Sequence, residues 1–177
     1  MGLRNSLKDS IKHVHSEVED IQIMKDYSSG RISSSNYETL LHKMHELWSE
    51  SSPQIDRLPG QFQQFLVNYL ESIGSDCKLQ PRPAKSKKTY NEFSFFYILL
   101  GSAMGASIII KRYEGASLPH EHLVHLSKQA RPLWATFLKK LDAESSGSAS
   151  DEIIRESLNL FNDLKFKIQS CEVVVEA

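Results

Sequence analysis

The chain has 177 residues and a mass of 20.2 kDa, with 21 Lys and Arg residues against 22 Asp and Glu residues. This length suits one domain, and the near-zero net charge argues against a dedicated nucleic-acid binder, which would carry a basic surplus. The two cysteines exclude a disulfide framework and a zinc site built from thiolates, which leaves the seven histidines as the main reservoir of metal ligands.

The first part of the chain predicts three amphipathic helices. Apolar residues recur every three or four positions over Asn5–Met24, Asn36–Trp48 and Gln61–Ile73, as on a helix with one buried face. Ser6 is a plausible cap for the first helix, and Gly30 ends it. The segment Met1–Ile21 is charged throughout and has no apolar signal-peptide core, so we expect a cytoplasmic protein.

The second part of the chain predicts a loop followed by three more helices. The loop covers residues 74–90 and carries a basic cluster of Lys85, Lys87 and Lys88, interpreted chiefly as a solvated loop. The helices are expected at Phe93–Ile110, Pro119–Leu141 and Asp151–Ile168. Alternation at Cys171–Val175 is too short to form a paired strand alone. We therefore predict one all-α domain over residues 1–177, with a short tail from about residue 170.

The segment Phe93–Ile110 is an uncharged stretch of 18 residues, long enough to be considered as a membrane span. As a helix it extends about 27 Å, just short of the ~30 Å hydrocarbon core of a bilayer. Its middle is small and partly polar, and the mean hydropathy of the chain, −0.36, is that of a soluble protein. We expect a central helix buried on nearly all sides and no membrane span.

Gly101 and Gly105 lie inside this predicted helix, where each glycine destabilises by about 1 kcal/mol relative to alanine. Close packing of another helix is the ordinary explanation, and this segment alone favours it. The alternative is a kinked helix whose bare backbone approaches a flat ligand, with the small side chains of Ser102, Ala103 and Ala106 leaving room.

Two groups of histidines have helical spacing but weak metal-site patterns. His42 and His45 lie three residues apart, and His120, His122 and His125 cluster at the start of a predicted helix. The order of residues does not match the H-E-x-x-H zinc motif. His122 and His125 could share a metal, but no carboxylate has a matching spacing. A solvated helix start is the favoured interpretation.

His15 lies at the border of the apolar stripe of the first helix, at about 80° on a helical wheel that starts at Leu7. Lys8, Lys12 and Glu19 follow on the same flank. An inward imidazole with a neighbouring carboxylate and cations suits an iron ligand beside an anionic cofactor. Spacing alone favours the ordinary alternative, a histidine at the edge of an amphipathic helix.

Several stretches together resemble the haem oxygenase family, in its bacterial, biliverdin-producing form. They occur in the family's order and spacing over most of the chain: Leu7–Glu19 with the pattern L-K-x-x-[TI]-x-x-x-H-x-x-x-E, Ser29–Leu41 with its glycine turn and Tyr37, Tyr97–Ala106 with the distal motif Y-V-x-E-G-S-x-L-G-[GA], then Trp134, Phe137 and Leu141, and Arg155–Ile168.

The resemblance implies a helical fold that holds haem between a proximal helix and a kinked distal helix. It assigns His15 as the proximal iron ligand and the metal-binding residue, Glu19 as its acidic neighbour, and Lys8 and Tyr97 as residues that hold the haem propionates. A neutral histidine ligand gives no strong electron push toward cleavage of the O–O bond, unlike a thiolate.

On the distal side, the resemblance assigns Gly101, Ser102 and Gly105 to the backbone that closes over bound O₂, as the catalytic positions and, for both glycines, as haem contacts. The motif is not fully matched. Leu100 replaces a Glu, Ala103 replaces an often polar residue, and Ser102 stands where mammalian-type members have Asp. These departures affect the expected distal water network and leave axial ligation untouched.

The implied reaction is oxidative cleavage of haem to biliverdin, CO and free iron, with electrons from a ferredoxin or a flavoprotein reductase. We expect a monomer or weak dimer. Three other hypotheses about function remain open. The protein is a haem carrier or sensor of the same fold, a relative that binds another flat ligand in a thiaminase-like helical fold, or a helical interaction module without a cofactor.

Overall fold

The computed structural model describes residues 2–78, 88–113, 115, 117–144 and 148–172. These residues form seven helices and two short strands, which confirms the all-α class. In chain order the elements are α1 (Leu3–Asp20), α2 (Gln22–Ser29), α3 (Ser34–Glu50), β1 (Ser51–Gln54), α4 (Gln61–Asp76), β2 (Lys88–Asn91), α5 (Glu92–Tyr113), α6 (Glu121–Ala143) and α7 (Ser148–Glu172).

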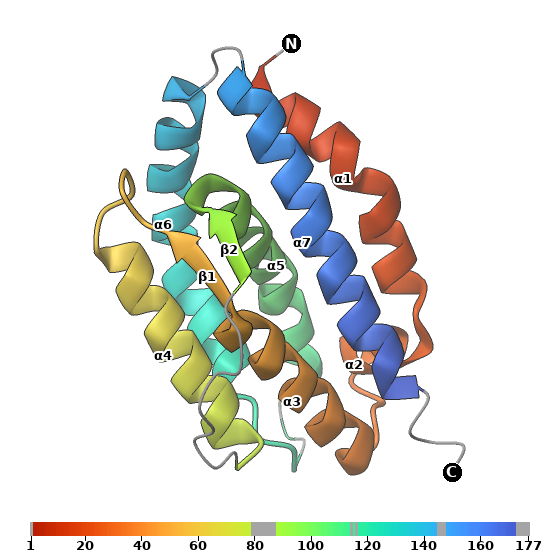
Figure 1. Ribbon diagram of the computed structural model, residues 1–177. Helices are drawn as coiled ribbons and strands as arrows, with labels where there is room; N and C mark the ends of the chain where they lie inside the picture. Colours follow the sequence, from red (N-terminus) through yellow and green to blue (C-terminus); the bar gives the residue numbers. More distant parts are fainter. Residues whose placement is uncertain (1, 79–87, 114, 116, 145–147, 173–177) are drawn as a thin grey trace.

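The helices pack around α5, whose most extensive contacts are with α6 and which also contacts α7. Figure 1 shows α7 lying alongside α1 near one side of the molecule, with α3 on the other side of α7. Helix α4 closes the opposite side by packing against α6 and α3. A continuous core of buried apolar side chains runs between these helices, as the amphipathic patterns predict.

The N-terminal helix differs from the prediction at both of its ends. It begins at Leu3 behind Gly2, so Ser6 lies inside α1 and does not cap it. Ile21 takes extended backbone angles (φ −63°, ψ 132°) and divides the predicted helix into α1 and α2. Gly30 ends α2 in the left-handed region (φ 72°), where a side chain would be strained and a Cβ atom would lie 3.0 Å from the carbonyl oxygen of Arg112.

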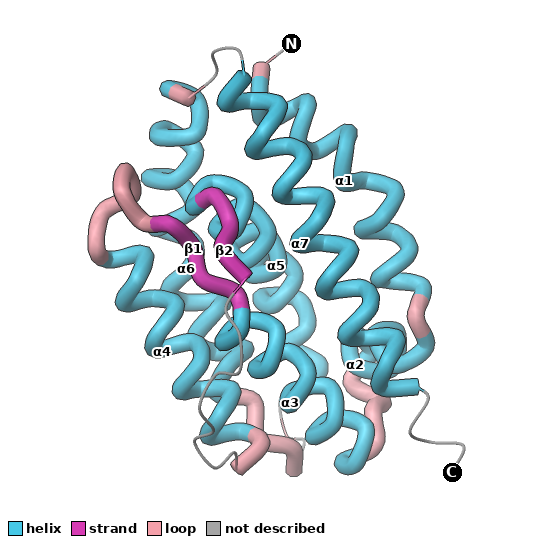
Figure 2. The backbone as a smooth tube through the Cα atoms, in the orientation of Figure 1, coloured by secondary structure: helices cyan, strands magenta, loops and turns pink. Residues whose placement is uncertain are grey.

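The prediction missed the two strands, because each has only four residues and neither shows a usable alternation. They pair in parallel, with Ser51 opposite Lys88 and Gln54 opposite Asn91, and Figure 2 shows them side by side against an otherwise helical backbone. The buried carboxylate of Glu92, at the start of α5, accepts hydrogen bonds from the backbone N–H groups of residues 56–58, which fixes the chain that follows β1.

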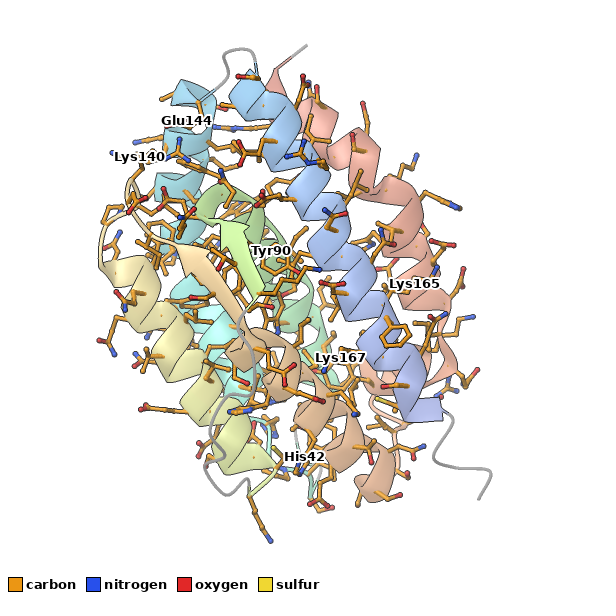
Figure 3. The ribbon with its side chains drawn as sticks, in the orientation of Figure 1. His42, Tyr90, Lys140, Glu144, Lys165 and Lys167 are labelled. Carbon is orange, nitrogen blue, oxygen red and sulfur yellow. The ribbon has the colours of Figure 1, made fainter. Side chains whose placement is uncertain are left out.

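At the C-terminus, α7 continues to Glu172, and the side chain of Cys171 is buried. The alternation over Cys171–Val175, which is too short to form a paired strand alone, is helical at its first two residues. Residues 173–175 lie outside the described part of the chain. Lys167 joins α7 to α3 through Glu46 (2.9 Å) and Glu50 (3.3 Å), and Figure 3 shows its position on the side of α7 that faces α3.

The basic cluster of the predicted loop is described only at Lys88, since Lys85 and Lys87 lie in residues 79–87. Lys88 begins β2, and its Nζ atom lies 2.6 Å from the carboxylate of Asp163 and 5.3 Å from the centre of the Tyr90 ring. This lysine is thus engaged in an ion pair with α7. Figure 3 labels Tyr90 on the same short strand.

Helix α5 is long and apolar enough to cross a membrane on length and composition alone, but half of its most apolar window is buried inside the protein. The prediction that it is buried on nearly all sides holds only for its first half. From Glu92 to Leu100 all residues except Tyr97 are buried, whereas Met104 is 51% exposed and Ile108 is 61% exposed in the second half. The difference begins at Gly101.

Candidate functional site

A largely apolar cavity of about 330 Å³ lies beside the second half of α5. Its volume falls within the range of about 300–1,000 Å³ found for small-molecule sites. All helices except α4 contribute to its lining, which consists of His15, Val18, Glu19, Met24, Tyr27, Ser28, Met44, Trp48, Gly101, Ser102, Gly105, Ala106, Ile109, Leu123, Leu126, Phe161, Leu164 and Ile168.

Gly101 and Gly105 present bare helix backbone to this cavity. A Cβ atom built on either residue meets no atom within 4 Å, apart from the helix's own nearby backbone, so no other element packs tightly against them. The close-packing explanation of the two glycines is therefore wrong. The missing side chains leave open space in the cavity, and the kink and flat ligand of the alternative stay predictions.

His15 lies at the mouth of the cavity, with its side chain 51% exposed. Its Nδ1 atom is 3.3 Å from a carboxylate oxygen of Glu19, and its ring lies 5.5 Å from that of Phe161 on α7. A carboxylate at Nδ1 favours the tautomer in which that nitrogen carries the proton, which leaves the lone pair of Nε2 for a metal. The predicted border position of His15 thus places it beside a cavity.

Of the other residues assigned by resemblance, Ser102 joins the glycines in the lining, and Lys8 and Tyr97 do not. Lys8 is exposed on α1. Tyr97 packs against α6, with its ring 5.7 Å from that of Trp134, and burial raises the pKa of its phenol. Leu100, the first departure from the family motif, points into the core and not into the cavity.

The residues of the cavity fit a flat, mostly apolar ligand that carries a metal. The walls are apolar, His15 offers one nitrogen, and the backbone of α5 leaves room for a planar molecule. Trp48 adds a buried polar atom: its indole Nε1 has no hydrogen-bond partner among the described residues.

Next to the cavity lies a buried hydrogen-bonded chain that the sequence analysis did not predict. The His122 Nδ1 atom is 2.6 Å from a carboxylate oxygen of Asp76, and its Nε2 atom is 2.8 Å from the hydroxyl of Tyr27. The side chains of His122 and Asp76 are 0% and 1% exposed. The solvated helix start expected for His122 is therefore wrong.

The direction of the hydrogen bonds in this chain follows from its chemistry. The Asp76 carboxylate only accepts, so His122 donates through Nδ1 and accepts at Nε2 a hydrogen bond from the Tyr27 hydroxyl. Burial acts to raise the pKa of Asp76, but the hydrogen bonds from His122 and the backbone N–H of Glu121 outweigh it and hold the pKa below its usual value. Burial raises the pKa of Tyr27 well above its usual value, so Tyr27 keeps its proton.

The carboxylate partner of His122, which sequence spacing did not reveal, is Asp76 on α4, 46 residues away in the sequence. A signal for its burial was present, since His122, Leu126, Ala130, Phe137 and Leu141 follow one face of α6 and all five are buried. Tyr27, which lines the cavity, connects this polar chain to the ligand space. The chain links α2, α4 and α6 at the cavity wall.

The remaining histidines do not form a metal site in the described part of the chain. No group of three or more His, Cys, Asp or Glu residues there is arranged to hold a metal ion. His42 lies 3.9 Å from Glu38 on the surface of α3. Burial, with a smaller effect of His42, lowers the pKa of His45. His125 stacks on Phe65, with ring centres 5.0 Å apart, and not with His122.

Comparison with known proteins gives no assignment. No protein-family model matches the chain, and no curated protein is significantly similar to it in sequence. Function is therefore inferred from the geometry of the cavity and from the motif resemblance.

Proposed function

We propose that this protein is a haem oxygenase that binds haem in the cavity between α1 and α5. The observation that carries the proposal is the composition of the cavity wall. An imidazole at its mouth, apolar side chains along its walls and two glycines with open space over their Cα atoms occur together in one site. The imidazole and the two glycines belong to His15, Gly101 and Gly105, which are also residues at which the chain matches the haem oxygenase motifs.

In this proposal each part of the site has a physical task. His15 binds the iron through Nε2, while Glu19 holds Nδ1 and fixes the orientation of the ring. Apolar side chains such as Met44 and Leu126 exclude water from the faces of the ligand. The backbone at Gly101 and Gly105 leaves space for a small molecule on the ligand's face, with no acid–base side chain at either glycine.

Bound haem would supply the iron at which dioxygen is activated, and the products would be biliverdin, CO and free iron. Electrons would come from a ferredoxin or a flavoprotein reductase. Lys88 is a weak candidate for the docking of such a donor, because it is already paired with Asp163.

A haem titration followed by absorption spectroscopy tests the proposal. The wild-type protein should give a Soret band that saturates at one equivalent, and His15→Ala should lose the spectrum of a histidine-ligated haem. His13→Ala is the matched control, because His13 lies on the same helix with its side chain 89% exposed and is not part of the lining. A wild-type protein without a Soret band, or a His15→Ala variant with an unchanged spectrum, would contradict the proposal.

A second candidate is a haem carrier or sensor without turnover. It is favoured by Leu100, a fully buried apolar residue that stands where the distal motif has Glu and so offers no acidic group there. Reduction of the haem complex with ascorbate or a reductase under air separates the two. Conversion of the Soret band to the broad biliverdin absorption supports the oxygenase, and a persistent Soret band supports the carrier.

A further inference from the structure

Tyr27 joins the cavity to the buried hydrogen-bonded chain of His122 and Asp76, and the proposed function assigns no task to this chain. Tyr27 belongs to the cavity lining and is 4% exposed, while its hydroxyl lies 2.8 Å from the His122 Nε2 atom. The rings of Tyr37 and Tyr113 lie 6.1 and 6.0 Å from that of Tyr27. The phenol is therefore shielded from solvent, and His122 is the group placed to take up its proton.

The hydrogen-bond acceptor of Tyr27 sets it apart from the two tyrosines beside it. The hydroxyl of Tyr113 donates to the backbone carbonyl of Tyr27 at 2.9 Å, and that of Tyr37 donates to the carbonyl of Pro119. A peptide carbonyl does not take up a proton near neutral pH, whereas a neutral imidazole does. Of these three tyrosines, the one that lines the cavity is thus the one with a base at its hydroxyl.

Asp76 prepares His122 to hold a second proton. Its carboxylate accepts hydrogen bonds from the His122 Nδ1 at 2.6 Å and from the backbone N–H groups of Glu121 and His122 at 2.9 and 2.8 Å. A carboxylate in hydrogen-bonding contact with an imidazole stabilises its protonated form, because opposite charges at close range favour ionisation. If the phenol proton moves to Nε2, the positive charge that results on His122 is therefore already balanced.

We infer that Tyr27 is a one-electron donor to an oxidant bound in the cavity, with His122 as the acceptor of its proton. In this step the O–H bond of Tyr27 breaks, an N–H bond forms at Nε2 of His122, and one electron passes from the phenol to the oxidant. The products are a neutral tyrosyl radical, an imidazolium held by Asp76, and an oxidant reduced by one electron.

The identity of the oxidant rests on the proposed function, whereas the proton-coupled donor does not. With haem in the cavity, the oxidant is the haem after its oxidation by a peroxide, which is itself reduced to water. An electron from the reductant of the haem, together with the return of the proton from His122, restores Tyr27. The site thus reduces an over-oxidised ligand at the expense of the external reductant.

Photo-oxidation of the ligand-free protein tests Tyr27 without haem. Tris(bipyridine)ruthenium(III), generated by a light flash with persulfate as the quencher, supplies the one-electron oxidant. The wild type should give a tyrosyl signal in electron paramagnetic resonance, and Tyr27→Phe, which keeps the ring and removes the hydroxyl, should lose most of it. Transient absorption should show slower radical formation in heavy water, because the proton moves with the electron. A hydrogen bond with a purely structural role would not produce these effects.

Tyr90→Phe is the matched control. The Tyr90 hydroxyl also bonds an ionisable group, Asp163, but that carboxylate is paired with Lys88 at 2.6 Å, and Tyr90 is not part of the cavity lining. This variant should keep the wild-type signal. If Tyr27→Phe does not fold, His122→Gln replaces it: an amide accepts a hydrogen bond but does not take up the proton, so most of the signal should be lost although Tyr27 is present.

The haem complex then tests whether the occupant of the cavity takes the electron. Hydrogen peroxide added to the ferric haem complex should give the tyrosyl signal in the wild type and in Tyr90→Phe, and should give little or none in Tyr27→Phe. Haem affinity should change by less than about twofold in Tyr27→Phe, because the ring remains in the cavity wall.

Two results would overturn the inference while the haem proposal stands. Equal radical signals from the wild type and Tyr27→Phe would place the electron donor elsewhere. A Tyr27 signal with ruthenium and none with haem and peroxide would show that a bound oxidant does not take the electron. A wild-type protein that binds no haem would reject the proposed function, and the ruthenium experiment still decides whether Tyr27 is the proton-coupled donor.

Discussion

The two halves of α5 differ in what surrounds them, although both are apolar. In the first half, Phe93, Phe95 and Phe96 are 0% exposed, and the Phe96 ring meets Phe62 and Phe95 in edge-on contacts at 5.2 and 5.3 Å. In the second half, the two glycines face open space and two large side chains are exposed. One helix thus serves as the centre of the core and as a wall of the cavity.

The hydrophobic content of a helix segment alone therefore does not determine whether its side chains are buried. The first half is enclosed because Glu92 anchors its start and large aromatic side chains fill the space between helices. The second half lacks side chains of that size at Gly101 and Gly105, and space remains. Substitutions in the two halves of α5 should therefore differ in their effect on stability.

The largest effect is expected in the packed half. Phe96→Ala should lower the free energy of unfolding by about 3–5 kcal/mol, because it removes a fully buried ring and leaves a void. Urea denaturation followed by circular dichroism measures this. A loss below about 1 kcal/mol would show that the first half of α5 is not tightly packed.

The next effect concerns the polar chain that holds the opposite cavity wall. Asp76→Asn should destabilise by about 3 kcal/mol at neutral pH, because it removes the charged acceptor of the hydrogen bonds from the His122 Nδ1 and from the backbone N–H groups of Glu121 and His122. Since the folded-state pKa of Asp76 is lowered, its contribution is fully present above the unfolded pKa and is lost as the pH falls through the folded value.

Urea denaturation at a series of pH values measures this contribution. The stability of the wild type should fall more steeply between about pH 5 and pH 2 than that of Asp76→Asn. Parallel curves for the two proteins would contradict a role for the Asp76 carboxylate in stability.

A smaller effect, with the opposite sign, is expected in the open half. Gly101→Ala and Gly105→Ala should each raise the free energy of unfolding of the ligand-free protein by about 1 kcal/mol, because alanine favours the helix and its methyl group meets no neighbour. Thermal and urea unfolding measure the gain. Destabilisation by either change would restore the close-packing explanation of the glycines.

The smallest effect is expected at an exposed apolar residue in the second half of α5. Ile108→Ser should change the free energy of unfolding by no more than about 0.5 kcal/mol, because the side chain is 61% exposed. The same urea experiment gives the value. A loss of 2 kcal/mol or more would mean that Ile108 packs against another element and that the second half is less open than described.

The sequence predicted those features that depend on neighbours along one helix. Periodicity located the helices within a few residues, and it placed His15 at the border of a buried stripe, where the structure finds the cavity mouth. It could not show that Asp76 meets His122, since these residues are 46 positions apart. The parallel pairing of β1 with β2 could not be predicted either, because the two strands are far apart in the sequence.

The two explanations of the glycines also could not be separated before the structure was known. A glycine pair four residues apart suits both close packing and a ligand cavity, and only the positions of neighbouring helices distinguish them. Trp48 likewise reads as a core residue from its periodicity. Its unpaired N–H becomes evident only when its surroundings are known.

The central claim is that the space between His15 and the glycines of α5 holds haem, and a haem titration of the Gly101→Ala/Gly105→Ala variant beside the wild type tests it most directly. We expect a saturable Soret band for the wild type and at least about tenfold weaker binding for the variant, in spite of its higher stability, because two methyl groups enter the ligand space. No Soret band in the wild type, or equal affinity in the two proteins, would contradict it.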